Sequence, residues 1–225
     1  MRILFEDNHL IAVNKPYGMP TQGDSSQDRD LLNWIKDDIK VRHNKPGNVF
    51  VGLLHRLDRP VGGVVLFAKT SKAASRLSDQ IRRHTVEKVY WAVVEGEPKQ
   101  PKGSVVQWLV KDEAKNIVTA FDNEVPGSLK AELTYTVLQT KDQLSLVEVY
   151  PKTGRPHQIR VAMKSLGTPI AGDAKYGASL KLLADDGGPA IALFARSFGF
   201  EHPITKTRQT VVAEPSLPIF SEVKG

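Results

Sequence analysis

The sequence predicts an α+β fold, with a long, mostly antiparallel mixed sheet in two halves and helices flanking it. An uninterrupted apolar run at 64–68 is rich in β-branched residues and too short for a helix, which is typical of a buried strand. Residues 131–137 alternate between apolar and polar, as a strand with one polar face does. Apolar residues recur at helical spacing in three further segments, 31–42, 71–84 and 159–166.

The N-terminal half contains short strands alternating with helices. The predicted elements are a hairpin of residues 3–5 and 10–13, a helix over 31–42, a strand at 64–68, a helix from 71 to about 84 and a strand over 87–94. Asp30 and Ser71 are the predicted N-caps of the two helices, because short polar side chains can accept the first free N–H groups. Residues 14–19 and 22–29 carry the Pro, Gly and Ser of turns and loops.

The C-terminal half follows a Pro- and Lys-rich stretch at 98–103, which we interpret as a boundary between two halves of one domain. The predicted elements are strands over 104–110, 116–121, 131–137 and 144–150, helices over 159–166 and 179–185, and an apolar run at 190–200. The short turn at 140–143 predicts that the strands on either side of it pair antiparallel.

Composition limits the classes of function. The 225 residues suit one large domain or two small ones, and the absence of cysteine excludes disulfides, thiolate zinc sites and cysteine nucleophiles. A net charge of +6 suits a polyanionic partner, although many basic proteins bind no nucleic acid. Charges interrupt the first residues where an export signal needs an apolar core, and no apolar run reaches the roughly 20 residues of a membrane span. We therefore expect a cytoplasmic protein that does not enter a membrane.

Asp58 is the strongest candidate for chemistry. It precedes a Pro- and Gly-rich turn at 60–63 that leads into the buried strand, and Arg56 and Arg59 lie close to it in the sequence. Nearby positive charge favours the ionised form of a carboxylate, and an ionised carboxylate can act as a nucleophile. On the residues alone, the competing interpretation is a surface salt bridge in a loop.

Three other residues have a structural interpretation on the sequence alone. Tyr90, in a K-x-Y pattern with Lys88, lies on a predicted strand, where a tyrosine usually serves packing. Arg160 is at the edge of the apolar stripe of the helix at 159–166, so it is expected to be exposed to solvent. Asp173 is interpreted as a structural loop residue rather than a metal ligand, because no other ligands cluster around it in the sequence.

Several motifs resemble the RluA-type pseudouridine synthase family. The three main ones are HRLD at 55–58 with its Gly-rich turn, strand and AKT, K-x-Y at 88–90, and TGRPHQIR at 153–160. The resemblance continues in NKP at 14–16, TPIAGD at 168–173, KYG at 175–177 and HPIT at 202–205, and so covers nearly the whole chain. The chain departs from the family where many members have Thr-Ser-Gly instead of residues 61–63, and a Thr or Ser instead of Pro156.

The resemblance implies the pseudouridine synthase catalytic fold, as one catalytic domain over residues 1–225 without a separate N-terminal RNA-binding domain. It also implies the isomerisation of uridine in ribosomal or transfer RNA to pseudouridine, after the nucleotide is flipped out of its helix. Asp58 is then the nucleophile, Tyr90 lies against the target base and Arg160 pairs with Asp58, the three meeting in a cleft between the halves. Further RNA contacts are expected at His55, Arg56, Arg59, Lys15, Arg155 and His157.

The implied reaction involves neither a redox step nor hydrolysis, so we expect no cofactor, no metal and no obligatory protein partner, and a monomer. Two other classes stay open. One is a non-catalytic RNA-binding relative, which the presence of Asp58, Tyr90 and Arg160 disfavours. The other is a hydrolytic uracil glycosylase that uses the same carboxylate and releases free uracil.

Overall fold

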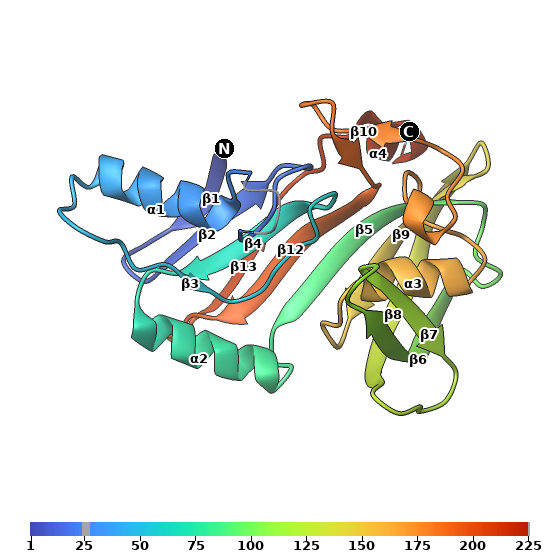
Figure 1. The fold of residues 1–225 in the computed structure, drawn as a ribbon, viewed down its shortest axis with the longest axis horizontal. Coiled ribbons are helices and arrows are strands. Elements are labelled where there is room, and N and C mark those ends of the chain that lie inside the picture. Colours follow the sequence, from blue (N-terminus) through green and yellow to red (C-terminus); the bar gives the residue numbers. More distant parts are fainter. Residues whose placement is uncertain (24–27, 225) are drawn as a thin grey trace. The chain divides into compact units, whose positions relative to one another are not determined.

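The structure is a computed structural model that describes residues 1–23 and 28–224. The loop predicted at 22–29 lies in part, at 24–27, outside the described residues. The chain forms two compact units: unit 1 comprises residues 1–87 and 195–214, and unit 2 comprises residues 88–194 and the chain from Pro215 onward. Each unit combines antiparallel strands with helices (Figure 1), which confirms the predicted α+β class. The boundary predicted at 98–103 is wrong, because these residues lie within unit 2 and the division falls after Glu87.

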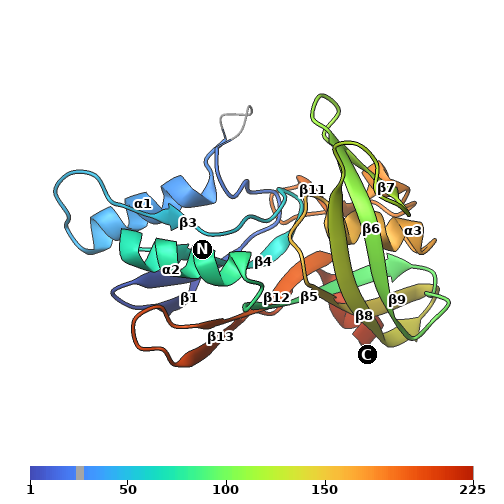
Figure 2. The ribbon, with the colours of Figure 1, turned by 90° about the horizontal axis from the view of Figure 1, so that it is seen from below.

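Unit 1 is a sheet whose helices lie on one face (Figure 2). Its elements are β1 (Arg2–Glu6), β2 (Leu10–Lys15), α1 (Leu31–Arg42), β3 (Gly52–Leu53), β4 (Gly62–Ala68), α2 (Ser71–Arg82), β12 (Leu193–Glu201) and β13 (Arg208–Val212). The strand order is β1-β2-β4-β12, with β13 beside β12 and β3 beside β4. Every residue of β4 is buried, which explains why this strand is a continuous apolar run rather than an alternating one.

The helix caps of unit 1 confirm one prediction and correct another. The Asp30 side chain accepts the backbone N–H of Asn33 at 2.9 Å, as an N-cap does. For α2 the cap is Thr70 rather than Ser71, and its hydroxyl accepts the N–H of Ala73 at 3.2 Å. Thr70 takes this role because its backbone is extended, whereas the next residue already belongs to the helix.

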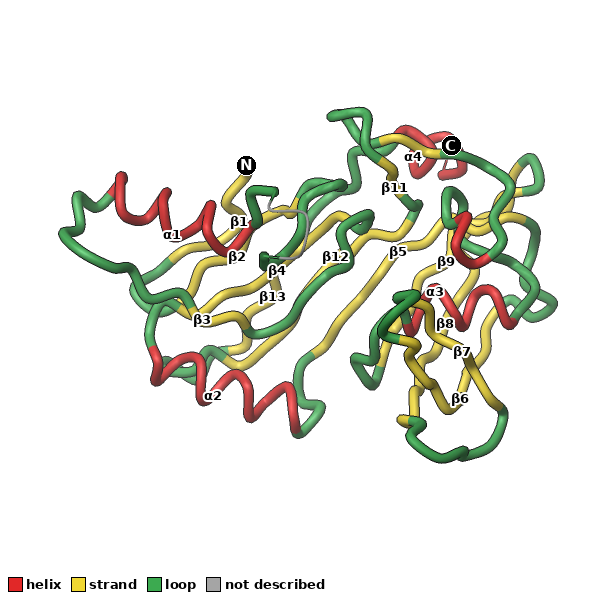
Figure 3. Tube along the Cα trace, in the orientation of Figure 1, coloured by secondary structure: helices red, strands yellow, loops and turns green. Residues whose placement is uncertain are grey.

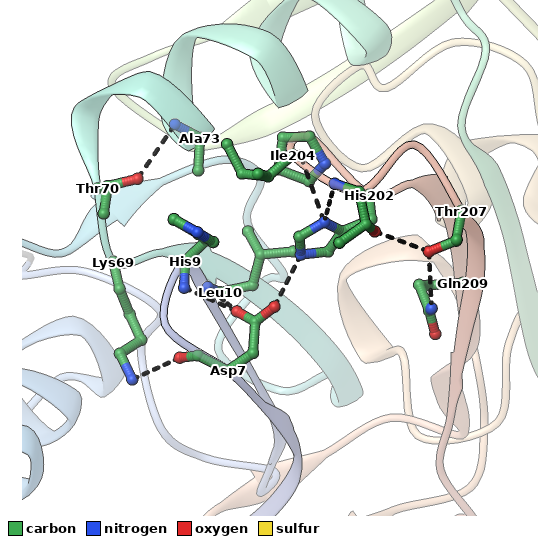
Figure 4. A network of polar contacts seen from close by, with 12 residues as sticks. Asp7, His9, Leu10, Lys69, Thr70, Ala73, His202, Ile204, Thr207 and Gln209 are labelled. Atoms are coloured by element: carbon green, nitrogen blue, oxygen red, sulfur yellow. Dashed lines mark hydrogen bonds and ion pairs between the residues drawn. The ribbon is translucent and has the colours of Figure 1, made fainter.

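A network of hydrogen bonds joins the β12–β13 turn to the β1–β2 turn (Figure 4). The Nδ1 atom of His202 accepts the backbone N–H groups of Ile204 and Thr205, so its hydrogen is on Nε2, which donates to the Asp7 carboxylate at 2.7 Å. Asp7 in turn accepts the N–H groups of His9 and Leu10. The HPIT motif therefore serves the fold of unit 1.

Unit 2 combines antiparallel strands with helices that pack on them. Its elements are β5 (Glu87–Glu95), β6 (Lys102–Asp112), β7 (Ile117–Phe121), β8 (Leu129–Lys141), β9 (Leu144–Pro151), α3 (Gln158–Ser165), a 3₁₀ turn η1 (Ala174–Tyr176), β10 (Leu182–Leu183), β11 (Pro189–Ala190) and α4 (Pro218–Lys224). The strand order is β5-β9-β8-β6-β7. The predicted antiparallel pairing of β8 with β9 is confirmed.

The core under α3 comes from strands and helix together. Leu109, Val118 and Ala131 of the sheet pack with Val161 of α3 and with Tyr176 of η1. On β5, neighbouring residues point to opposite faces of the sheet, and the cross-strand partners of Tyr90 continue along the same face as Ala131. Tyr90 therefore belongs to the face of unit 2 that α3 covers.

The helix predicted at 179–185 is wrong. This segment contains β10, which pairs with β11, and Figure 3 draws the region around β11 as strand and loop. The Glu95 carboxylate accepts the N–H groups of Ser179 and Leu180, and the N–H of Ala184 donates to the carbonyl of Gly188 across a tight turn. These bonds hold the chain away from helical geometry. The helix α4, by contrast, was not predicted.

Within 1–23 and 28–224, no helix has the length and apolar character needed to cross a membrane.

Candidate active site

The loop that carries Asp58 in unit 1 is held by bonds to its backbone. The hydroxyl of Thr21 donates to the carbonyl of Leu57 at 2.8 Å and accepts the N–H of the same residue at 3.1 Å. The N–H of Gly18 donates to the carbonyl of Arg59, and the carbonyl of Asp58 accepts the N–H of Val61, both at 3.0 Å. Asp58 itself is only partly buried. The loop thus presents a partly exposed carboxylate on an anchored backbone, the arrangement that a positioned catalytic group needs.

The entry into β4 depends on a glycine. Gly63 has a φ of +120°, and a Cβ atom there would lie 2.4 Å from the carbonyl oxygen of Ala195. Only glycine fits such a close approach of two backbones. Val61, where many family members have a hydroxyl residue, is 2% exposed and contributes to the core.

His55, at the start of the HRLD motif, supports the loop. Its Nε2 atom accepts the N–H of Leu66 at 3.0 Å, and its ring stacks on Phe198 with the centroids 4.6 Å apart. These two contacts hold the imidazole against β4 and β12. The RNA contact predicted for this residue stays a prediction.

The RNA contact predicted for Lys15 is wrong, because this side chain lies in the interior of unit 1. Its side chain is fully buried, and its Nζ atom donates to the carbonyls of Met19 at 2.7 Å, Pro16 at 3.0 Å and Arg59 at 3.2 Å. Burial lowers the pKa of Lys15 to about 7, with Arg59 adding to the effect and Asp58 opposing it. Because the ammonium has no exposed surface, it ties the NKP turn to the HRLD loop instead of contacting a phosphate.

The two arginines that flank Asp58 lie nearer the surface. Arg56 is exposed, and Arg59 forms an ion pair with Asp28 in which the side chains are 33% and 57% exposed. Surface pairs of this kind contribute little stability, so a phosphate could replace Asp28 at small cost. Both residues stay predicted RNA contacts.

The K-x-Y motif of unit 2 is tied to the turn that precedes α3. Tyr90 is half-buried and lies opposite Val149 of β9. The Lys88 ammonium donates to the carbonyl of Thr153 at 3.2 Å, and burial lowers its pKa. The second and third motifs therefore meet through this lysine.

The TGRP turn is organised around Gln158, the first residue of α3. Its side-chain oxygen accepts from the hydroxyl of Thr153 at 2.7 Å and the N–H of Arg155 at 3.0 Å, and its amide donates to the carbonyl of Glu132. The Arg155 side chain is partly exposed and donates through Nε to the carbonyl of Lys130 at 3.0 Å. This places the predicted RNA contact at Arg155 beside β8.

His157 lies in the interior of unit 2. It has a left-handed backbone with φ 51° and is 8% exposed. Its Nδ1 atom lies 2.7 Å from the hydroxyl of Tyr176, which also accepts the N–H of Val118. This hydrogen bond ties the Nδ1 edge of the imidazole to η1, so that edge serves the fold. An RNA contact through the rest of the ring stays a prediction.

Arg160 is buried, so the exposed position expected from the helical pattern alone is wrong. Its Nε and Nη2 atoms bind the two carboxylate oxygens of Asp173 at 2.7 and 2.8 Å, and the two side chains are 6% and 1% exposed. The contact with Arg160 gives Asp173 a structural role in its loop, as the sequence predicted. The pairing of Arg160 with Asp58 stays a prediction.

Two solved structures share this fold over most of their length. The structure titled human RNA pseudouridylate synthase domain containing 4 matches with a TM-score of 0.77 at 27% identity, covering 97% of this chain and 89% of that one. The structure titled human RNA pseudouridylate synthase domain containing 1 matches with a TM-score of 0.72, covering 97% and 85%; at 20% identity it shows the fold alone. The fold class is that of pseudouridine synthases.

Sequence relatives lead to the same family. The tRNA pseudouridine synthase C of Haemophilus ducreyi is 36% identical over 230 residues, covering 94% of this chain and 89% of the relative. The ribosomal large subunit pseudouridine synthase C of Vibrio vulnificus is 35% identical, covering 91% of this chain and 62% of the relative. An uncharacterized RNA pseudouridine synthase of Bacillus subtilis is 35% identical, covering 96% and 68%.

Residues 9–165 match the family model of RNA pseudouridylate synthases. The chain belongs to this family, and the resemblance carried by its three main motifs is confirmed. The chain spans about three fifths to nine tenths of the length of the relatives described above.

Proposed function

We propose that this protein isomerises a specific uridine in ribosomal or transfer RNA to pseudouridine, with Asp58 as the nucleophile. The observation that carries the proposal is the HRLD loop, whose backbone is anchored by Thr21 and Gly18 while Asp58 stays partly exposed. A carboxylate fixed in this way can attack without first paying the entropy of being ordered. Membership of the family makes uridine the natural substrate of that carboxylate.

The reaction is balanced without any other reactant. The N-glycosidic bond of the uridine breaks, the uracil turns over, carbon 5 bonds to the ribose, and the hydrogen of carbon 5 is lost to solvent while N1 gains one. The bond that Asp58 forms as nucleophile breaks in the same cycle, which releases the carboxylate unchanged. A base inside a helix is out of reach, so the nucleotide is flipped at a cost of about a few kcal/mol. We propose Tyr90 as the residue that stacks on the uracil and Arg160 as the cation that supports the charge of Asp58.

The RNA partner follows from charge and from the relatives. A net charge of +6 suits a polyanion, and Arg56, Arg59 and Arg155 are at least partly exposed. One relative is named for transfer RNA and another for ribosomal RNA, so both are candidate substrates. We propose further that the two units act as one catalytic domain, that the protein works as a monomer, and that it does so in the cytoplasm, which its lack of cysteine suits.

The test uses RNA from a strain that lacks this protein. Purified protein is incubated with that RNA, labelled with tritium at carbon 5 of uracil, and pseudouridines are mapped by sequencing. Tritium release with a new pseudouridine at one position supports the proposal. Release of free uracil would show a hydrolytic glycosylase instead, and saturable binding with neither product would show a non-catalytic relative.

A further inference from the structure

We propose that Asp173 and Tyr176 are positioning residues that fix the plane and direction of the Arg160 guanidinium for catalysis. This inference rests on the proposed function, in which Arg160 supports the charge of Asp58. Neither Asp173 nor Tyr176 would touch the RNA, because they are 1% and 2% exposed. All the contacts that carry the inference lie within unit 2.

Asp173 fixes one edge of the guanidinium. Its two oxygens bind Nε and Nη2 of Arg160 at 2.7 and 2.8 Å. Such a forked contact sets both the plane of the guanidinium and its rotation about the last side-chain bond, which a single hydrogen bond does not. Because Asp173 occupies the edge with Nε, Arg160 can bind a second acceptor, such as a catalytic carboxylate, only through the edge that carries Nη1.

Tyr176 restrains the guanidinium in a second direction. The Cζ atom of Arg160 lies 5.0 Å from the centre of the Tyr176 ring, a cation–π distance. The ring is itself immobilised, since its hydroxyl accepts the N–H of Val118 at 2.9 Å and bonds Nδ1 of His157 at 2.7 Å. The aromatic surface beside Arg160 is therefore anchored both to strand β7 and to the start of α3.

The local sequence explains why both residues approach Arg160 from one turn. Asp173 and Tyr176 lie three positions apart, and the N–H of Tyr176 donates to the carbonyl of Asp173 at 2.9 Å, which closes the turn and brings the two positions together. The turn is fixed on one side by Gly172, where a Cβ atom would lie 2.6 Å from the carbonyl oxygen of Ala190. The GD-xx-YG spacing is thus the spacing that places a carboxylate and a ring beside the same side chain.

The experiment is a double-mutant cycle on kcat, measured per folded molecule with saturating RNA. In Asp173→Asn we expect kcat to fall about tenfold or more, with KM for RNA within about twofold of the wild type, because only the geometry of a catalytic group has changed. In the Arg160→Ala background the same Asp173→Asn change should alter kcat no further. If Asp173 had a purely structural role, Asp173→Asn would lower the folded fraction and leave kcat per folded molecule unchanged.

A pair of tyrosine variants keeps the inference testable if Asp173→Asn fails to fold. Tyr176→Phe keeps the ring beside Arg160 and loses only the hydroxyl, whereas Tyr176→Leu loses the ring. We expect kcat to fall more in Tyr176→Leu than in Tyr176→Phe, and only while Arg160 is present. Equal kcat values for the two variants, or losses that multiply with that of Arg160→Ala, would overturn the inference.

The same data separate this inference from the proposed function. If Arg160→Ala keeps the kcat of the wild type, the catalytic role of Arg160 is wrong, and the positioning role is wrong with it. If Arg160→Ala is slow while Asp173→Asn and Tyr176→Leu turn over normally, the function stands and only the positioning role is overturned. Loss of tritium release in Asp58→Asn reports on the nucleophile independently of both.

Discussion

Each unit contains a buried cation in a family motif, and the two are stabilised in opposite ways. Lys15 of unit 1 is surrounded by three neutral backbone carbonyls, whereas Arg160 of unit 2 is matched by the carboxylate of Asp173. Carbonyls satisfy the hydrogen bonds of an ammonium but not its charge, so burial can lower the pKa of Lys15 to about 7. A guanidinium stays charged and needs a true counter-ion.

The difference indicates how each motif holds its loop. Lys15 crosslinks the backbones of two loops and leaves Asp58 on a scaffold made of main-chain bonds. Arg160 is part of a side-chain assembly that includes a carboxylate and a ring. We therefore expect unit 1 to tolerate a change of the Asp58 side chain without loss of fold, and unit 2 to be sensitive to any change in its ion pair.

The largest expected effect is on Asp58. Asp58→Asn should abolish pseudouridine formation, because the amide has nearly the same shape but is no nucleophile. The fold and most of the RNA affinity should survive, since the loop is held by its backbone. The measurement is tritium release over hours with purified protein. Asp28→Asn, which changes an exposed carboxylate nearby, is the control and should keep its activity. Appreciable product from Asp58→Asn would sink the assignment.

The next effect is on the stability of unit 2. Arg160→Ala leaves the Asp173 carboxylate buried without its charge partner, a change that costs about 3–5 kcal/mol of unfolding free energy. Arg208→Ala removes a surface pair with Glu87, whose side chains are 44% and 75% exposed, and should cost less than about 1 kcal/mol. Urea titrations of the variants give both values. Similar losses for the two arginines would contradict the buried pair.

The third prediction concerns Lys15 and pH. Its pKa is about 7 in the folded protein and 10.5 ordinarily, so between these values the unfolded chain binds the proton and the folded protein does not. Unfolding then takes up a proton, and stability should rise as the pH rises from about 7 towards 10, by no more than about 5 kcal/mol. Lys15→Met should lack this contribution, whereas Lys40→Met, at an exposed position, should keep it. Parallel stability curves for wild type and Lys15→Met would refute the burial of a titrating ammonium.

The smallest expected effect is on Thr21, whose hydroxyl anchors the backbone of the HRLD loop. Thr21→Val keeps the side-chain shape but leaves the buried N–H and carbonyl of Leu57 without their partner, at a cost of about 1–3 kcal/mol. Thr21→Ser retains the hydroxyl and should cost less. Denaturation midpoints and kcat should both distinguish the two variants, because a loosened loop also misplaces Asp58. If valine and serine behave alike, the hydroxyl does not hold the loop.

Local patterns were sufficient for most of the secondary structure. The apolar run of β4, the alternation of β8 and the cap at Asp30 depend on neighbours within a few residues, and all three predictions are confirmed. The failure at 179–185 has a non-local cause, because the carboxylate that captures the Ser179 N–H belongs to Glu95, 84 residues earlier in the chain. A partner that distant leaves no periodic signal.

The sequence by itself determined the family and the order of the motifs, and it was the source of the proposal that Asp58 is the nucleophile, because these depend on residue identity and spacing alone. Only the tertiary structure decided which charged side chains are buried and which groups they bind. Lys15 meets the carbonyl of Arg59, 44 residues away, and Arg160 meets Asp173 across the end of a helix and a loop. The physical reason is that a charged residue contributes the same polar position to a hydrophobicity pattern whether its side chain is exposed or buried. Its environment is set by partners that the fold alone brings within hydrogen-bonding distance.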